Sequence, residues 1–131
     1  NFKLVNDTFG HRAGDNVIMS LRDMLLDLSR PGDVSARIGG DEFALWLDGV
    51  GSDVAGVRAE ELIKRSAFMK NMSGTADKLV GLSVGIATFL PDSNENLEDL
   101  IVRADTAMYV IKRKGKGGFQ IAASAKDDRT R

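Results

Sequence analysis

Residues 37–43 read RIGGDEF and place two glycines directly before two acids. Carboxylate oxygens are ligands that Mg²⁺ prefers, with phosphate and water filling its other positions. Glycine lets another group approach the backbone closely because it has no Cβ atom. This run therefore indicates a binding site for a nucleoside triphosphate and its metal, with Asp41 as the first candidate metal ligand. The same pattern also suits an ordinary turn with solvated acids, so both interpretations stay open on this motif alone.

The segments on either side of this run are expected to form a β-hairpin. Residues 33–38 enter it as a strand-like run and residues 43–47 leave it as a second one, separated by a short break that contains glycine. Successive side chains of an extended chain point to opposite faces. Asp41 and Glu42 are therefore not expected to share one metal-binding face, and Glu42 ranks second.

Helical spacing of apolar residues predicts helices that start at Asp15, at about residue 53 and after Asn96. Asp15 is expected to cap the first helix, and Asn96, with Asp99 at the third position, the last. Residues 79–90 are predicted as the strongest strand, with one bulky and one nearly bare face, and a short strand follows at 119–122. The order of elements predicts an α+β sheet with flanking helices.

The composition bounds the class of protein. The chain has 131 residues, a net charge of −1, no cysteine and a single histidine, which favours one globular domain and disfavours nucleic acid as a partner. No apolar run reaches the length of a membrane span, so no direct membrane insertion is expected. The chain begins without methionine, and we expect a longer parent protein. The domain is expected at 1–122, with a polar tail or linker at 123–131.

Separated motifs resemble the GGDEF family, the diguanylate cyclases. They are residues 2–11 (FKLVNDTFGH) with the pair at 14–15, residues 37–43, residues 83–87 (SVGIA), and residues 104–109 (ADTAMY) with Lys112. The resemblance implies a central, mostly antiparallel sheet with flanking helices, similar to cyclase and polymerase-palm domains with a ferredoxin-like core. It implies that a homodimer condenses two GTP molecules into cyclic di-GMP and two pyrophosphates, with Mg²⁺ (or Mn²⁺) as cofactor.

The resemblance also implies roles for individual residues. Asp41 would bind the metal and act with Glu42 in catalysis, and Asn6 and Asp15 would bind guanine. The remaining substrate-binding positions would be Phe2, Lys3, Gly39, Gly40, Lys112 and Lys116. Lys116 stands where the family usually has arginine, so the charge is kept and the bidentate fork is lost. Asp15 could instead be a helix cap, and the lysines could be partners of a helix dipole.

Arg30 and Asp33 form an R-x-x-D pattern shortly before Gly39. Its position resembles the inhibitory site at which the family binds its product, cyclic di-GMP. Arginine can fork onto guanine or phosphate, and aspartate can accept from guanine N–H groups. The alternative is a helix-ending turn with a surface ion pair, which would contribute little to stability.

The preferred interpretation is the cyclase output domain of a cytoplasmic protein, or of a membrane-anchored one, that carries a sensory or regulatory domain. One alternative is a catalytically silent module that binds GTP or cyclic di-GMP and regulates an attached domain. Another is a generic α+β interaction domain. The family's first strand ends in a metal-binding aspartate that would precede Asn1. The 131 residues alone are therefore expected to have little cyclase activity.

Overall fold

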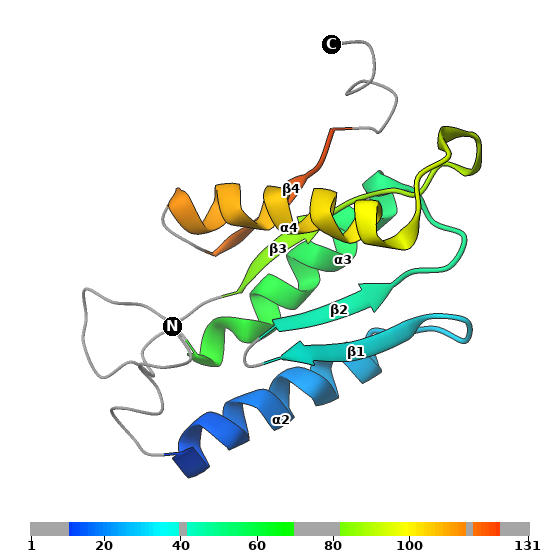
Figure 1. Cartoon of the computed structure of the whole chain (residues 1–131). Helices are drawn as coiled ribbons and strands as arrows, with labels where there is room; N and C mark the ends of the chain where they lie inside the picture. The colour runs from blue at the N-terminus through cyan, green and yellow to red at the C-terminus, as the bar shows by residue number, and fades with distance from the viewer. Residues whose placement is uncertain (1–10, 40–41, 70–81, 115–116, 124–131) are drawn as a thin grey trace. The chain divides into compact units, whose positions relative to one another are not determined.

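The computed structural model describes residues 11–39, 42–69, 82–114 and 117–123 (Figure 1). Within these ranges, no helix combines the length and apolar character needed to cross a bilayer. The chain divides into two compact units, residues 1–49 with 61–81 and residues 50–60 with 82–131.

The elements confirm the predicted α+β class. In chain order they are α2 (His11–Asp27), β1 (Val34–Gly39), β2 (Glu42–Trp46), α3 (Ser52–Arg65), the 3₁₀ turn η1 (Ser66–Met69), β3 (Ser83–Ile86), the 3₁₀ turn η2 (Pro91–Ser93), α4 (Leu97–Arg113) and β4 (Gly118–Ile121).

Helix α2 is amphipathic, and its apolar stripe forms much of the core of the first unit. Val17, Ile18, Leu21 and Leu25 are all buried, as their helical spacing predicts. The helix already includes His11, so the prediction that Asp15 caps its start is wrong. Gly14 is buried within this helix, although a glycine inside a helix costs about 1 kcal/mol.

The predicted hairpin is confirmed. Strands β1 and β2 pair antiparallel, with Val34 opposite Trp46 and Arg37 opposite Phe43. The register then shifts, so that Gly39 pairs with Glu42 and β1 holds an extra residue near the tip. Such bulges twist a strand and re-aim its side chains, and they are common beside functional sites.

An ion-pair group joins the ends of α2 and α3 within the first unit. Arg65 hydrogen-bonds Asp27, and its Nε lies 3.0 Å from an oxygen of Glu61. The hydrogen bond to Asp27, followed by the one to Glu61, raises the pKa of the Arg65 guanidinium. These groups are exposed, so their contribution to stability is small.

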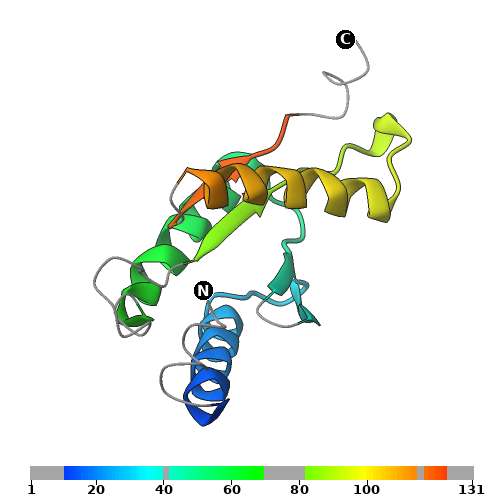
Figure 2. The same ribbon diagram turned by 60° about the vertical axis from the view of Figure 1, so that its left-hand side comes forward.

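In the second unit, β3 and β4 pair in parallel and α4 packs along both strands (Figures 1 and 2). The bare face predicted for the β3 segment is where α4 lies. A Cβ atom built on Gly85 would lie 1.9 Å from the carbonyl oxygen of Ala104 and 2.7 Å from the amide nitrogen of Met108. Only a residue without a side chain allows this approach.

The strand predicted over residues 79–90 is shorter in the structure. Residues 79–81 lie outside the described residues, and residues 87–90 are not in a strand. The ladder with β4 continues as far as the hydrogen bond from the Ala122 amide to the Ile86 carbonyl. Beyond it, the Thr88 carbonyl accepts from the Arg103 side chain instead of from a neighbouring strand.

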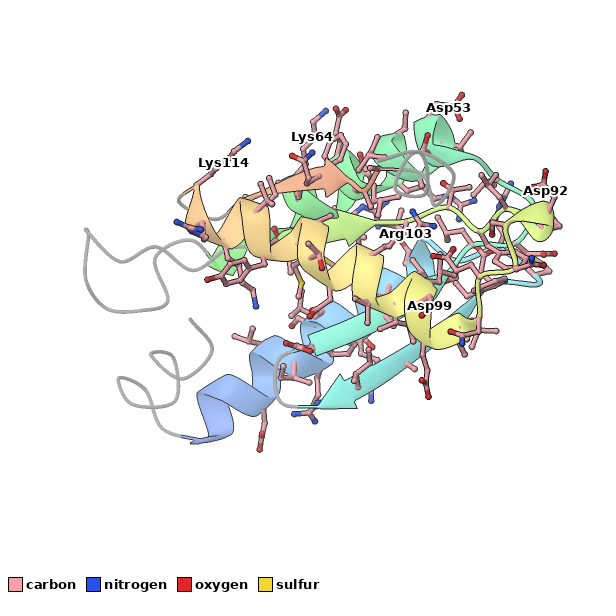
Figure 3. All side chains as sticks on the ribbon, turned by 45° about the horizontal axis from the view of Figure 1, so that its top comes forward. Asp53, Lys64, Asp92, Asp99, Arg103 and Lys114 are labelled. Carbon is pink, nitrogen blue, oxygen red and sulfur yellow. The ribbon has the colours of Figure 1, made fainter. Side chains whose placement is uncertain are left out.

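The Arg103 side chain, labelled in Figure 3, lies on α4 and hydrogen-bonds three other segments of the second unit. Its guanidinium donates to both carboxylate oxygens of Glu95, at 2.6 and 2.8 Å, and to the carbonyls of Thr88 and Ala123, both at 2.7 Å. The Glu95 side chain is 4% exposed and that of Arg103 is 12% exposed. A carboxylate buried to this degree depends on its partner, since an unpaired charge there would be strongly destabilising.

We expect Arg103→Lys to lower the free energy of unfolding by about 2 kcal/mol. Lysine keeps the positive charge, but its single ammonium cannot reproduce the fork that reaches Glu95, Thr88 and Ala123 together. Urea denaturation followed by circular dichroism measures this change. Arg113→Lys is the matched control on the same helix, because Arg113 is exposed and lies 5.9 Å from the Tyr109 ring centroid. Equal midpoints for the two variants would contradict the role of Arg103.

The start of α4 confirms the predicted cap. The Asn96 side chain accepts from the Asp99 amide, and the Asp99 side chain accepts from the Asn96 amide, which completes a capping box. Along α4, Leu100 is buried, whereas Leu97 and Ile101 are exposed. Ala107 is buried as well.

Candidate functional site

The tip of the hairpin carries the first group of candidate residues. Strand β1 ends at Gly39 and β2 begins at Glu42, and these two residues face each other across the ladder. Gly40 and Asp41 lie outside the described residues. Glu42 is exposed, so a carboxylate beside the tip is open to solvent and to ligands.

A carboxylate in this position suits a hard divalent cation. Mg²⁺ is usually held by one or two carboxylates together with substrate phosphates and water, without a cage made wholly of protein. The described part of the chain contains no group of three or more acids, histidines or cysteines close enough to hold a metal. Glu42 supplies one exposed carboxylate beside the tip.

Asp15 lies on α2, four residues after the helix begins, and is exposed. The structure therefore removes the alternative interpretation of this residue as a helix cap. Its carboxylate remains available as an acceptor. Phe2, Lys3 and Asn6 lie outside the described residues.

Lys112 lies in the last turn of α4 and is exposed. The C-terminal end of a helix has a partial negative charge, which favours a lysine there whether or not a ligand binds. Lys112 belongs to the second unit, whereas the hairpin belongs to the first. Lys116 lies outside the described residues.

The R-x-x-D turn connects α2 to β1 and is closed by its own aspartate. The Arg30 amide donates to Asp33 Oδ2 at 2.9 Å, and the Asp33 amide donates to the Arg30 carbonyl at 3.0 Å. Gly32 has a φ of 96°, a conformation that favours glycine. Arg30 is exposed and Asp33 is half-buried. The structure thus brings together the two residues of this predicted site.

Asp48 is a neighbour of this turn that the sequence analysis missed. Its amide donates to Asp33 Oδ1 at 3.0 Å. A Cβ atom built on Gly32 would lie 3.3 Å from Asp48 Oδ2. The signal was present in the hairpin register: Val34 pairs with Trp46, and two more steps place position 48 opposite position 32.

Helix α2 and one face of the hairpin also enclose a hollow of about 410 Å³ in the first unit. Its walls combine apolar side chains of α2 with two arginines, Arg22 and Arg37. Arg37 belongs to the signature run, so the hollow begins close to the hairpin tip. Arg22 also forms an exposed ion pair with Asp23, at 3.2 Å.

Comparison of the sequence with known proteins shows which family it matches. A family model described as "Diguanylate cyclase, GGDEF domain" matches residues 1–118. The chain is 36% identical over 126 residues to the uncharacterized protein YtrP of Bacillus subtilis, covering 96% of this chain and 21% of that protein. It is 34% identical over 122 residues to the diguanylate cyclase TpbB of Pseudomonas aeruginosa, covering 92% of this chain and 28% of that protein. The chain thus spans less than a third of either relative.

Among solved structures, the chain resembles the coiled coil and GGDEF domain of DgcB from Caulobacter crescentus, in complex with c-di-GMP. The TM-score is 0.81 at 30% sequence identity, covering 93% of this chain and 64% of that chain. A second similar structure is the active GGEEF domain of a diguanylate cyclase from Vibrio cholerae. There the TM-score is 0.78 at 27% identity, covering 95% of this chain and 78% of that chain.

Proposed function

Because the chain belongs to the diguanylate cyclase GGDEF domain family, we propose that it condenses two molecules of GTP into cyclic di-GMP. In each transfer, the 3′-hydroxyl oxygen of one nucleotide attacks the α-phosphorus of the other, the hydroxyl proton is lost and pyrophosphate leaves. Two such transfers close the ring. The observation that carries this proposal is the complete run from Gly39 to Glu42 at the tip of a bulged hairpin.

The carboxylates at the tip supply the catalytic chemistry in this proposal. Asp41 is the metal ligand, and Glu42, exposed at the start of β2, is the second acid. A divalent cation such as Mg²⁺ or Mn²⁺, when bound there, would neutralise charge on the transferring phosphoryl group. Gly39 and Gly40 bring backbone amides close to the phosphates, since neither has a side chain to obstruct them.

Asn6 and Asp15 would select guanine by hydrogen bonding to its base. Guanine presents two neighbouring N–H donors, which a carboxylate can accept together, and an asparagine can both donate and accept. Adenine lacks this donor pair and would be rejected. The exposed carboxylate of Asp15 on α2 supports the proposal. Phe2 would contact the substrate, and Lys3, Lys112 and Lys116 would meet the triphosphate.

A homodimer is required by this reaction scheme, because each subunit would present one GTP to the other. The curated relatives are several times longer than this chain. A sensory or regulatory domain in the same protein would control how the two subunits meet. Arg30 and Asp33 would bind cyclic di-GMP and inhibit the enzyme when product accumulates.

The test of the proposed function is product analysis after incubation of the full-length protein with GTP and Mg²⁺. Formation of cyclic di-GMP and pyrophosphate is the expected result, and ATP is the control substrate. Binding of GTP or cyclic di-GMP without turnover would instead support the silent module, which the lysine at position 116 favours. Absence of binding to either nucleotide would contradict both functions.

Arg30→Ala is expected to relieve product inhibition. Removing the guanidinium removes the bidentate, charge-assisted contact to guanine or phosphate. We expect the inhibition constant for added cyclic di-GMP to rise at least about tenfold. Initial rates of pyrophosphate release at increasing product concentration measure this. Arg22→Ala removes an exposed arginine of α2 as a control, and unchanged inhibition in Arg30→Ala would refute the site.

A further inference from the structure

Strand β1 is paired along one of its two edges. Within the described residues, its sheet consists of β1 and β2 alone. In an antiparallel pair, every second residue of a strand directs its amide and carbonyl away from the partner strand. The other edge of β1 therefore presents backbone donors and acceptors to a further strand. The six residues of β1, VSARIG, include neither proline nor lysine, which commonly block such an edge.

The hollow of about 410 Å³ between α2 and the hairpin lies beside this edge. Of the described residues that line it, Ser35 and Arg37 belong to β1, whereas β2 contributes only Phe43. Leu45, which pairs with Ser35 in the ladder, is not among them. Figure 1 likewise shows α2 running alongside β1. A strand added to the edge of β1 would therefore pass along the hollow, beside α2.

The hollow combines positive charge with apolar walls. Arg22 of α2 and Arg37 of β1 both line it, and none of its described lining residues is acidic. Met19 and Leu26, about one helical turn before and after Arg22, are 50% and 58% exposed. The ion pair of Arg22 with Asp23 is itself exposed, so it holds Arg22 only weakly. These walls favour a side chain whose apolar stem ends in a carboxylate, which an arginine can bind through two parallel hydrogen bonds.

The opposite face of β1 is apolar and exposed. Val34 pairs with Trp46 and Ala36 pairs with Ala44, so these four side chains share that face. The exposed fraction is 61% for Val34 and 44% for Trp46. An apolar side chain on a neighbouring strand would lie beside Val34 and remove it from water. The two faces of β1 thus favour a strand in which acidic and apolar residues alternate.

We infer that the free edge of β1 is a docking site for an extended peptide of alternating acidic and apolar residues, contributed by a partner protein. The peptide would add a third strand to the hairpin, a mode in which backbone hydrogen bonds provide affinity and side chains provide specificity. Its acidic side chains would point toward α2 and bind Arg22 and Arg37, and its apolar side chains would cover Val34. The inference does not depend on the proposed cyclase reaction, because these residues have no assigned role in binding substrate, metal or product.

Fluorescence anisotropy of a labelled, capped hexapeptide of alternating valine and glutamate tests this inference on the full-length protein. We expect saturable binding, and no binding of the peptide in which lysine replaces glutamate. Arg22→Gln removes one of the two positive charges and should raise Kd about tenfold. Arg113→Gln removes an exposed arginine from α4 in the second unit, and as the matched control it should leave Kd unchanged. Equal affinity for the two peptides, or a wild-type Kd in Arg22→Gln, would overturn the inference.

Hydrogen exchange of the backbone amides distinguishes strand addition from binding through side chains alone. Amides of β1 that face the free edge should exchange more slowly in the complex. A peptide that is N-methylated at every residue has no amide donors, and its Kd should be at least about tenfold higher. If the methylated peptide binds as tightly as its parent and β1 exchange is unchanged, the peptide does not bind as a strand and the inference is wrong.

Two other occupants of this region give different results in the same experiments. Dodecanoate carries a carboxylate on an apolar chain but has no peptide backbone. If it binds more tightly than the peptide, the hollow is a site for a small amphipathic anion, which would overturn the inference. If the peptide instead dissociates a dimer of the protein in analytical ultracentrifugation, a second copy of this chain occupies the edge, and the partner we infer is wrong.

Discussion

Asp41→Asn is expected to lower the rate of cyclic di-GMP formation by about 1,000-fold, equivalent to roughly 4 kcal/mol of transition-state stabilisation. The variant keeps the size of the side chain and removes its charge. An amide is a much poorer ligand for a hard divalent cation than a carboxylate. The cation would then stabilise less charge on the transferring phosphoryl group. Initial rates of pyrophosphate release from GTP measure the loss.

Asp23→Asn is the matched control for this prediction, because Asp23 is an exposed aspartate whose carboxylate pairs with neighbouring Arg22. It should retain the wild-type rate. Glu42→Gln should have a smaller effect than Asp41→Asn, because successive side chains of an extended chain point to opposite faces and the two acids are not expected to share the metal. An Asp41→Asn enzyme within tenfold of the wild-type rate would contradict the assignment of Asp41 as the metal ligand.

Gly85→Ala is expected to lower the free energy of unfolding by about 3 kcal/mol or more, above the usual cost of overpacking a core. The added methyl group would lie 1.9 Å from the Ala104 carbonyl oxygen. That oxygen and the next nearest atom, the Met108 amide nitrogen, both belong to the backbone of α4. No side chain can therefore rotate to relieve the clash. Helix α4 would have to move away from β3, and their shared contacts would be lost. Urea denaturation followed by circular dichroism measures the change.

Gly118→Ala is the control within the same sheet. Gly118 pairs with Ser83 across the β3–β4 ladder, and a Cβ atom there would meet its nearest neighbours, on Ile111, at 3.9 Å. That distance is an ordinary van der Waals contact. We therefore expect Gly118→Ala to unfold close to the wild-type midpoint. Equal midpoints for the two alanine variants would show that α4 does not lie as close to Gly85 as the structure places it.

The helices could be predicted well because helical spacing of apolar residues is a local property. The stripe of α2 and the capping box at Asn96 both follow from residues a few positions apart. One error is local: α2 begins at His11, so Asp15 does not cap it. The error in the strand predicted over residues 79–90 arises where distant residues decide the outcome. Residues 87–90 have the composition of a strand, but the Thr88 carbonyl accepts from Arg103, fifteen residues further along the chain.

In the candidate site, too, some features follow from neighbouring residues and others depend on residues far apart in the chain. Arg30 and Asp33 are neighbours along the chain, so their pattern was visible without a structure. Asp48 joins them through a hydrogen bond across fifteen positions, and only the pairing of β1 with β2 brings it there. The roles of Asp41, Asn6 and Lys116 stay predictions that rest on the motifs, because these residues lie outside the described part of the chain.

The sequence by itself determined the family and the class of fold, because signature motifs and apolar periodicity lie in short stretches of neighbouring residues; the roles of the site residues stay predictions from those motifs. Only the tertiary structure decided that residue 85 must lack a side chain and that Arg103 holds three segments together. It also decided that each Asp33 carboxylate oxygen accepts from a backbone amide, one of Arg30 and one of Asp48. Each of these depends on distances between segments far apart in the chain. Those distances are set by packing and hydrogen bonding of the folded molecule, and not by local spacing.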